Sequence, residues 1–166
     1  MRVNPKQQKY MNKAISNTIA NLPHMKSSCL GCTHSFCCRH QENIDVALGE
    51  FELLKSYMDE GVISRAKEAV AGYRLTGRFT CPFLGEDGRC VAYEVRPLAC
   101  SLHHTISDPS VCDVSGGVKD VAYINKVETL MAVSSKEKKF RKYVRDYATH
   151  GFDNMIEHFA KMLEKS

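Results

Sequence analysis

Eight cysteines in two blocks constrain this chain more than any other feature of its sequence. The first block is dense in cysteine and too short for regular structure, so we expect it to be a loop. We interpret the two blocks as halves of one metal-binding centre that folding brings together. The predicted ligands are Cys29, Cys32, Cys37 and Cys38 in the first block, and Cys81, Cys90, Cys100 and Cys112 in the second.

The spacing of these cysteines is typical of metal ligands. Cys29 and Cys32 form a Cys-x-x-Cys pair, which places two sulfurs on one side of a tight turn, and Gly31 between them suits that turn. All-sulfur ligation selects zinc, iron or an iron–sulfur cluster over hard cations. Four cysteines close one zinc site or hold one cluster, and eight suffice for two zinc sites. Adjacent side chains in extended backbone point apart, so Cys37 and Cys38 suit a bridged or two-metal centre.

Three other uses of cysteine fit the pattern less well. Disulfides need an oxidising compartment, and the first twenty residues lack the apolar core of a secretory signal. A bridge between neighbours Cys37 and Cys38 would also be strained. Buried structural thiols are disfavoured because the cysteines cluster in turn-rich segments rather than on helical faces. A thioredoxin-like redox pair usually follows a βαβ pattern, which this sequence lacks.

Composition places the chain among globular proteins. Its 166 residues are 43% hydrophobic and 25% charged, and they are most simply one domain. No apolar run approaches the length of about 18 residues that a membrane span needs. We therefore expect a cytoplasmic protein with reduced thiols and no membrane contact. The net charge of +4 becomes −4 if all eight cysteines are thiolates, so a basic composition is weak support for nucleic-acid binding.

Apolar periodicity predicts helices before the first block and between the two blocks. The Asn-Pro pair at positions 4 and 5 is typical of a helix start, and the pattern predicts a helix over residues 5–22. Between the blocks we expect one helix over residues 50–60, ended by Gly61, and another over 63–75, followed by Gly77.

The C-terminal third is also expected to be helical. Residues 118–133 have a helical period with Met131 on the inward face. Ser134 and Glu137 have the spacing of a capping box and predict the start of the next helix. Asp153 is the expected cap of a last helix.

These elements define the expected fold class. Residues 44–48 alternate like a short strand, and the turn-rich stretch 85–88 leaves room for a short β-hairpin with Cys81 and Cys90 at its ends. The prediction is a mainly α protein, a small helical domain around a cysteine-rich, irregular metal-binding region. We expect one domain over residues 1–166, with an N-terminal helix in 1–28, a cysteine-cluster region with two inserted helices in 29–112, and C-terminal helices in 118–166.

The two blocks together resemble the CxxCxxCC cysteine-cluster family, whose members are common in bacteria and are described as zinc- or iron-chelating. The similarity covers roughly residues 29–100, including Cys81-Pro-Phe-Leu and the Tyr93-Glu-Val-Arg96-Pro97 step before the last motif cysteine. Two departures stand out. Four residues separate Cys32 from Cys37, more than the two that the name CxxCxxCC indicates. Ser101 stands where an arginine commonly follows the last motif cysteine. The resemblance implies that the cluster cysteines are Cys29, Cys32, Cys37, Cys38, Cys81, Cys90 and Cys100, with Cys112 at a less regular extra position.

Several other side chains near the cysteines are candidates for the site. Arg96 is expected to donate to thiolates or to pair with Glu94, unless it forms only a surface ion pair. The basic run over residues 136–145 can meet nucleic-acid phosphate, but we favour a solvated helix face. We interpret four histidines chiefly as exposed loop residues, with the last two the first candidates for further ligands: His34, His40, His103 and His104.

The sequence therefore predicts a metal-binding protein with a cysteine-ligated zinc or iron centre. Its role would be structural, or would lie in metal storage, transfer or sensing, because a closed all-cysteine zinc site has no open position for catalysis. One alternative is an iron–sulfur protein with a redox or enzymatic role. The other is a zinc-stabilised adaptor for nucleic acid or protein. Whether the chain is an enzyme stays open.

Overall fold

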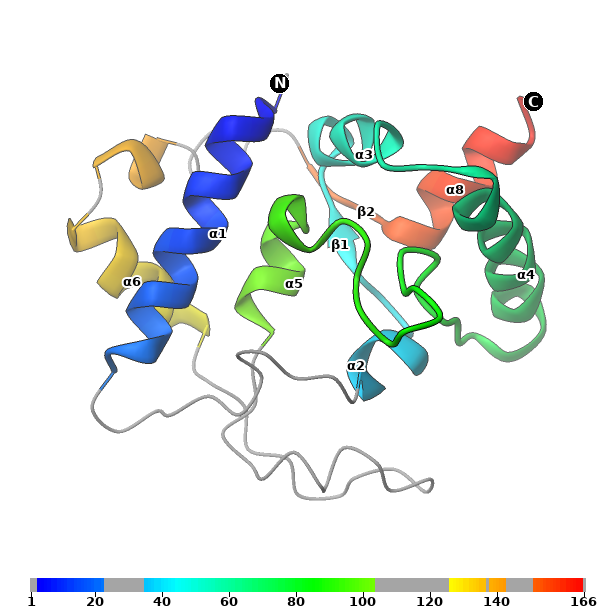
Figure 1. The fold of residues 1–166 in the computed structure, drawn as a ribbon, viewed down its shortest axis with the longest axis horizontal. Coiled ribbons are helices and arrows are strands. Elements are labelled where there is room, and N and C mark those ends of the chain that lie inside the picture. Colours follow the sequence, from blue (N-terminus) through cyan, green and yellow to red (C-terminus); the bar gives the residue numbers. More distant parts are fainter. Residues whose placement is uncertain (1–2, 23–34, 104–125, 137, 143–150, 166) are drawn as a thin grey trace.

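The computed structural model confirms the mainly α fold class (Figure 1). It describes residues 3–22, 35–103, 126–136, 138–142 and 151–165. In chain order the elements are α1 (Pro5–Ala20), α2 (Phe36–Arg39), β1 (Asp45–Val46), α3 (Leu48–Lys55), α4 (Glu60–Thr76), the 3₁₀ helix η1 (Tyr93–Val95), α5 (Leu98–Leu102), α6 (Lys126–Lys136), β2 (Asp153–Asn154) and α8 (Met155–Leu163).

Helix α1 begins as its sequence predicts. The side chain of Asn4 accepts a hydrogen bond from the backbone N–H of Lys6 at 2.9 Å, and proline occupies the first helical position. The apolar residues Met11, Ile15 and Ile19 are all at most 1% exposed. The 3.6-residue period therefore identified both the helix and its buried face.

The boundary between α3 and α4 differs from the prediction at Gly61. Helix α3 ends at Lys55, well before this glycine, and Gly61 lies in the first turn of α4. The reason is Asp59, whose carboxylate accepts from the backbone N–H of Val62 at 2.7 Å and so caps a new helix. The predicted stop at the other end is confirmed, because Gly77 follows α4 with φ of 72°.

Helix α6 shows two errors of the sequence pattern. Met131, predicted to point inward, is 68% exposed, whereas Val133 is fully buried. Ser134 lies inside α6 and does not start a new helix. Packing against α1 determines which face of α6 is buried. The apolar period of the α6 sequence is weak and did not predict that face. Residues 118–125 and Glu137 lie outside the described residues.

The small sheet joins two distant segments. The predicted strand at 44–48 is present as β1, and it pairs antiparallel with β2, Val46 opposite Asp153. Asp153 is therefore in a strand, and the cap of α8 is its neighbour Asn154. The Asn154 side-chain oxygen accepts from Ile156 N at 3.4 Å and from Ile44 N at 3.3 Å. The side-chain amide of Asn154 thus holds both the start of α8 and the backbone directly before β1.

The cysteine-bearing segments contain more regular structure than expected. The described end of the first block forms α2 rather than a loop, and η1 and α5 follow Cys90. The predicted hairpin is present in minimal form, with one antiparallel bridge between Leu84 and Cys90. Its turn is closed by Gly85 N donating to Arg89 O at 2.8 Å, and Gly88 has φ of 75°.

Two groups of helices flank the middle of the molecule. Helices α4 and α8 lie side by side at one end, and α1 lies beside α6 at the other, with α5 and the sheet between them (Figure 1). Each group has its own hydrophobic cluster. Phe51 and Phe159 pack edge to face at 5.2 Å in the first, and Ile15 and Phe140 are fully buried in the second.

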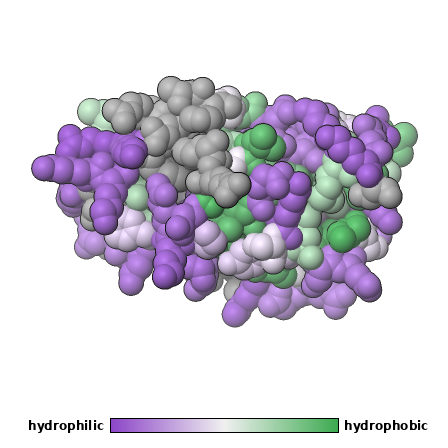
Figure 2. All heavy atoms as spheres, turned by 90° about the horizontal axis from the view of Figure 1, so that it is seen from above, coloured by the Kyte–Doolittle hydropathy of each residue, from purple (hydrophilic) through white to green (hydrophobic). Residues whose placement is uncertain are grey.

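The surface is mostly polar. Figure 2 shows hydrophilic side chains at both ends of one face, with hydrophobic groups near its middle. No helix among the described segments is long and apolar enough to cross a membrane.

The shared amide of Asn154 generates a prediction about stability. Replacing Asn154 with Ala removes the α8 cap, and we expect the free energy of unfolding to fall by about 1–2 kcal/mol. Asp153→Ala is the matched control, because that carboxylate is partly exposed and pairs with the surface amine of Lys161. Urea unfolding of both variants measures the difference. Equal losses would show that Asn154 does not link β1 to α8.

Candidate metal centre

The structure describes five of the eight predicted cysteines. Cys37 and Cys38 lie on α2, Cys81 and Cys90 precede and close the hairpin, and Cys100 is on α5. All five are free thiols. Cys29, Cys32 and Cys112 lie outside the described residues.

Backbone hydrogen bonds hold the end of the first block against the start of the second. The N–H of Cys81 donates to the carbonyl oxygen of Cys38 at 2.7 Å. Gln41 and Phe79 exchange two backbone hydrogen bonds, of 3.0 and 2.8 Å. The hydroxyl of Thr80 also donates to the Arg39 carbonyl at 3.1 Å. Two segments about forty residues apart in sequence are thus joined directly beside their cysteines.

The local backbone is arranged to stabilise negative sulfur. Cys81-Pro-Phe-Leu forms a tight turn, with Leu84 N donating to the Cys81 carbonyl oxygen at 3.0 Å. Burial raises the pKa of the Cys81 thiol, and the backbone N–H groups of Phe83 and Leu84 oppose this rise. The N–H of Ala92 does the same for Cys90. The first turn is anchored to α4, because Arg65 Nε donates to the Pro82 carbonyl at 2.9 Å. N–H donors around a sulfur favour its thiolate, the form that binds metals.

The thiols also influence one another electrostatically. Burial, with added contributions from the charges of Cys90 and Cys37, raises the pKa of Cys81 to about 12. Burial raises the pKa of Cys100 well above its usual value, with added contributions from Cys81 and Cys90. Each of these sulfurs therefore lies within the electrostatic reach of the others. A cation among them would reverse this repulsion and favour the thiolates.

Cys37 and Cys38 are adjacent thiols whose pKa values shift in opposite directions. The hydrogen bond from the Cys38 thiol lowers the pKa of Cys37 to about 7. The same hydrogen bond, followed by burial, raises the pKa of Cys38. Cys37 is exposed, whereas Cys38 is partly buried. The outer sulfur is therefore the more easily ionised of the two and the one that solvent reaches.

The described cysteines share a neighbourhood without forming a complete coordination sphere. In the described part of the chain, no three side chains of Cys, His, Asp or Glu are grouped so that they could hold a metal ion. Their chemistry nevertheless suits zinc or iron: the donors are sulfurs, backbone N–H groups support two of them, and the buried hydroxyl of Ser35 has no hydrogen-bond partner.

Two amide side chains of α1 position the chain before Cys100. The carbonyl oxygen of Arg96 accepts from Gln8 Nε2 at 2.9 Å and from Asn12 Nδ2 at 3.0 Å. Pro97 follows, and because its ring fixes φ near −55° the chain turns directly into α5. Residues Arg96 and Pro97 are therefore held in place by α1, which precedes both cysteine blocks in the sequence.

A buried carboxylate completes this arrangement. Glu50 is 1% exposed, and its Oε1 accepts from the N–H of Leu98 at 2.9 Å at the start of α5. The same oxygen accepts from Gln8 Nε2 at 3.3 Å, and Oε2 accepts from Ala47 N at 3.3 Å. Ser101, in the place of an expected arginine, is fully buried and donates to Asn12 Oδ1 at 2.6 Å. The sequence alone did not identify Glu50, Gln8 and Asn12 as residues of the site. Their one signal in the sequence is that each is a polar residue at or next to a position where the helical period predicts an apolar side chain.

Arg96 has a different environment from either sequence interpretation. It is 7% exposed, so it does not form a surface ion pair, and Glu94 pairs with Lys9 instead. The guanidinium stacks 4.0 Å above the ring of Tyr93 and donates to Ser16 Oγ at 3.4 Å. Burial raises the pKa of Cys90, and the charge of Arg96 opposes this rise through space.

The histidines divide according to their position in the chain. His40 is exposed, in agreement with the loop interpretation, whereas His103 is half-buried. Burial, followed by the charge of Lys126, lowers the pKa of His103, so this imidazole favours its neutral form. His34 and His104 lie outside the described residues.

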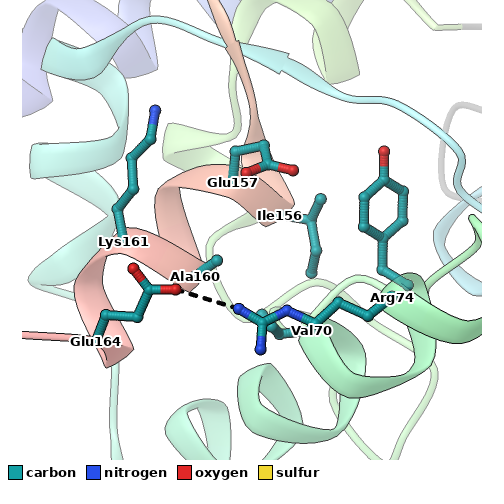
Figure 3. A pocket seen from close by; sticks show the side chains of 8 residues that line it. Val70, Arg74, Ile156, Glu157, Ala160, Lys161 and Glu164 are labelled. Atoms are coloured by element: carbon teal, nitrogen blue, oxygen red, sulfur yellow. Dashed lines mark hydrogen bonds and ion pairs between the residues drawn. The ribbon is translucent and has the colours of Figure 1, made fainter.

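A pocket between α4 and α8 is separate from the cysteines. It has a volume of about 220 Å³, and Figure 3 shows Arg74 of α4 reaching across to Glu164, with an ion-pair distance of 3.1 Å. The lining is aliphatic and charged, without a cysteine or histidine: Val70, Tyr73, Arg74, Ile156, Glu157, Ala160, Lys161 and Glu164. The sulfur chemistry of this protein is therefore not located there.

Comparison with known proteins identifies the family. The profile of the CxxCxxCC family, described as "Putative zinc- or iron-chelating domain", matches residues 28–128, which is more than half of the chain and includes all eight cysteines. This chain belongs to the CxxCxxCC family. No curated protein and no solved structure matches it. Helices α1 and α8 lie outside the matched residues of this CxxCxxCC protein.

The buried carboxylate generates the second prediction. Glu50→Ala leaves the N–H groups of Leu98 and Ala47 without this acceptor, so we expect a loss of about 2 kcal/mol or more in unfolding free energy. Glu50→Gln should recover only part of it, since an amide has one acceptor oxygen. Glu52→Ala, an exposed position of the same helix, is the control. A Glu50→Ala variant as stable as Glu52→Ala in urea would contradict this role.

Proposed function

We propose that this CxxCxxCC protein binds zinc or iron through sulfur ligands drawn from both cysteine blocks. The observation that carries the proposal is that Cys38, Cys81, Cys90 and Cys100, from three separate stretches of chain, lie in or against one hydrophobic cluster, with Cys81 N donating to the Cys38 carbonyl oxygen at 2.7 Å beside Cys37. Buried thiols that raise one another's pKa are unfavourable as thiolates unless a cation is present. The remaining predicted ligands are Cys29, Cys32 and Cys112.

The cysteines of the proposed centre differ in how deeply they are buried. Cys81 is buried and Cys100 is partly buried, and both pack against the hydrophobic cluster of α3, α4 and α8. A metal ion bound to them would fasten the second block to the core, so its binding energy would add to folding energy. Cys37 is exposed, so a competing ligand from solvent can reach that sulfur. This asymmetry supports metal storage, transfer or sensing as well as a structural role.

The adaptor alternative gains no specific support from the described part of the basic run over residues 136–145. Lys138, Lys139, Arg141 and Lys142 are exposed around Phe140, which is fully buried. That pattern is typical of the solvated face of a packed helix. We therefore keep metal binding as the one proposed function, with an iron–sulfur cluster as one form that an iron centre could take.

The test is metal content per chain for protein purified without oxygen and without an affinity tag. We expect bound zinc or iron in the wild type, and iron with matching sulfide would identify a cluster. Cys81→Ser and Cys100→Ser should lose metal and also lower the melting temperature, because metal binding is coupled to folding.

A control separates loss of a sulfur from loss of packing. Ala92 is 2% exposed and lies between Cys90 and Arg96, so Ala92→Ser adds a buried hydroxyl without removing a thiol. This variant should be less stable but keep its metal. A wild type that holds neither zinc nor iron, or a Cys81→Ser variant with full metal content and unchanged melting, would refute the assignment.

A further inference from the structure

Ser35 occupies the place where the family name spells a cysteine. In CxxCxxCC the third cysteine comes three residues after the second, and three residues after Cys32 this chain has Ser35. The vicinal pair is displaced by two residues, to Cys37 and Cys38. Serine differs from cysteine only in having oxygen in place of sulfur, so the position keeps a donor atom on the same short side chain.

The hydroxyl of Ser35 is buried without a partner. Ser35 is 8% exposed, and among the described residues its Oγ is the one buried side-chain oxygen or nitrogen that has no hydrogen-bond partner. Buried hydroxyls are normally paired, because leaving one unpaired forfeits its bonds to water. The other buried serine, Ser101, follows this rule by donating to Asn12.

The backbone of Ser35 is also in an uncommon conformation. Its φ is 51°, and it is the one non-glycine residue in the described segments with positive φ. Its carbonyl oxygen accepts from Cys38 N at 2.8 Å and from Arg39 N at 3.2 Å, which fixes Ser35 to the helix that carries the vicinal cysteines. Left-handed backbone at a serine is unfavourable and persists where surrounding interactions require it.

We propose that the hydroxyl oxygen of Ser35 is a ligand of the metal centre, in the place of the displaced cysteine. The oxygen would donate a lone pair to the ion and keep its proton, so no redox step or proton transfer is needed. This proposal rests on the proposed metal-binding function and specifies the site further, as a centre with one oxygen donor among sulfurs. The unpaired hydroxyl would then gain its partner when the metal binds.

The experiment compares Ser35→Ala and Ser35→Cys with wild type, with Thr129→Val of α6 as the control for a buried hydroxyl. Zn²⁺ affinity is measured by competition with a chromogenic chelator, and Co²⁺ absorption reports how many sulfurs ligate the ion. Urea unfolding of the metal-free proteins is measured in parallel.

For Ser35→Ala we expect Zn²⁺ affinity to fall by about tenfold or more. The metal-free Ser35→Ala protein should be at least as stable as wild type, because an unpaired buried hydroxyl has been removed. Ser35→Cys should restore affinity and increase the sulfur-to-cobalt charge-transfer band. Thr129→Val should keep an affinity close to that of wild type, because Thr129 lies on α6, which carries no cysteine.

Two results would overturn the assignment of Ser35. One is a Ser35→Ala protein with wild-type Zn²⁺ affinity, and the other is a Ser35→Cys protein whose Co²⁺ spectrum is unchanged. Either one leaves the proposed metal binding intact, since the wild type still binds the ion. Failure of the wild type to bind Zn²⁺ or Fe²⁺ at all would instead refute the metal-binding function, and the Ser35 ligand with it.

Discussion

The buried carboxylate of Glu50 is the interaction on which the arrangement of the cysteine segments depends. A side chain of this type is rarely buried without partners, and here its oxygens accept from α1, from the start of α5 and from the chain before α3. Three segments must therefore meet at one point for the fold to be stable. Because Cys100 lies two residues after Leu98, the same contact also determines where that thiol is placed.

Negative charge on Glu50 disfavours the thiolate form of the nearby cysteine. It adds to the effects that raise the pKa of Cys100, so carboxylate and thiolate disfavour each other in the metal-free protein. Arg96 provides only partial compensation, since it stacks on Tyr93 and acts mainly on Cys90. Among the described residues, Glu50 thus adds an excess of negative charge beside Cys100. A divalent ion would balance that excess, and this links the fold energetically to the metal we propose.

Local sequence signals predicted what local forces determine. The Asn-Pro start of α1, the glycine after α4 and the short strand at 44–48 depend on caps, backbone freedom and alternation, and all three are present. The error at Gly61 has a local cause, the Asp59 cap of α4, whereas two other errors occurred where a tertiary contact decides between local options. Asn154 rather than Asp153 caps α8 because its amide also contacts β1, and Met131 is exposed because α1 packs against another face of α6. The cysteine pattern predicted which sulfurs to consider, but no local signal predicts that Glu50 orients the helix that carries Cys100.

The family match covers less than the site requires. It ends at residue 128 and begins at 28, yet the amides that hold the Arg96 carbonyl come from α1, before the match. On the other side, the Cys81 thiol contacts the sulfur of Met155 at 4.0 Å, and Met155 belongs to α8, after the match. Two parts of the second block, at Cys81 and before Cys100, are therefore supported from helices that the family pattern does not include. The cysteine motif specifies donor atoms, whereas the flanking helices, through buried polar contacts and sulfur packing, determine how closely those donors can approach one ion.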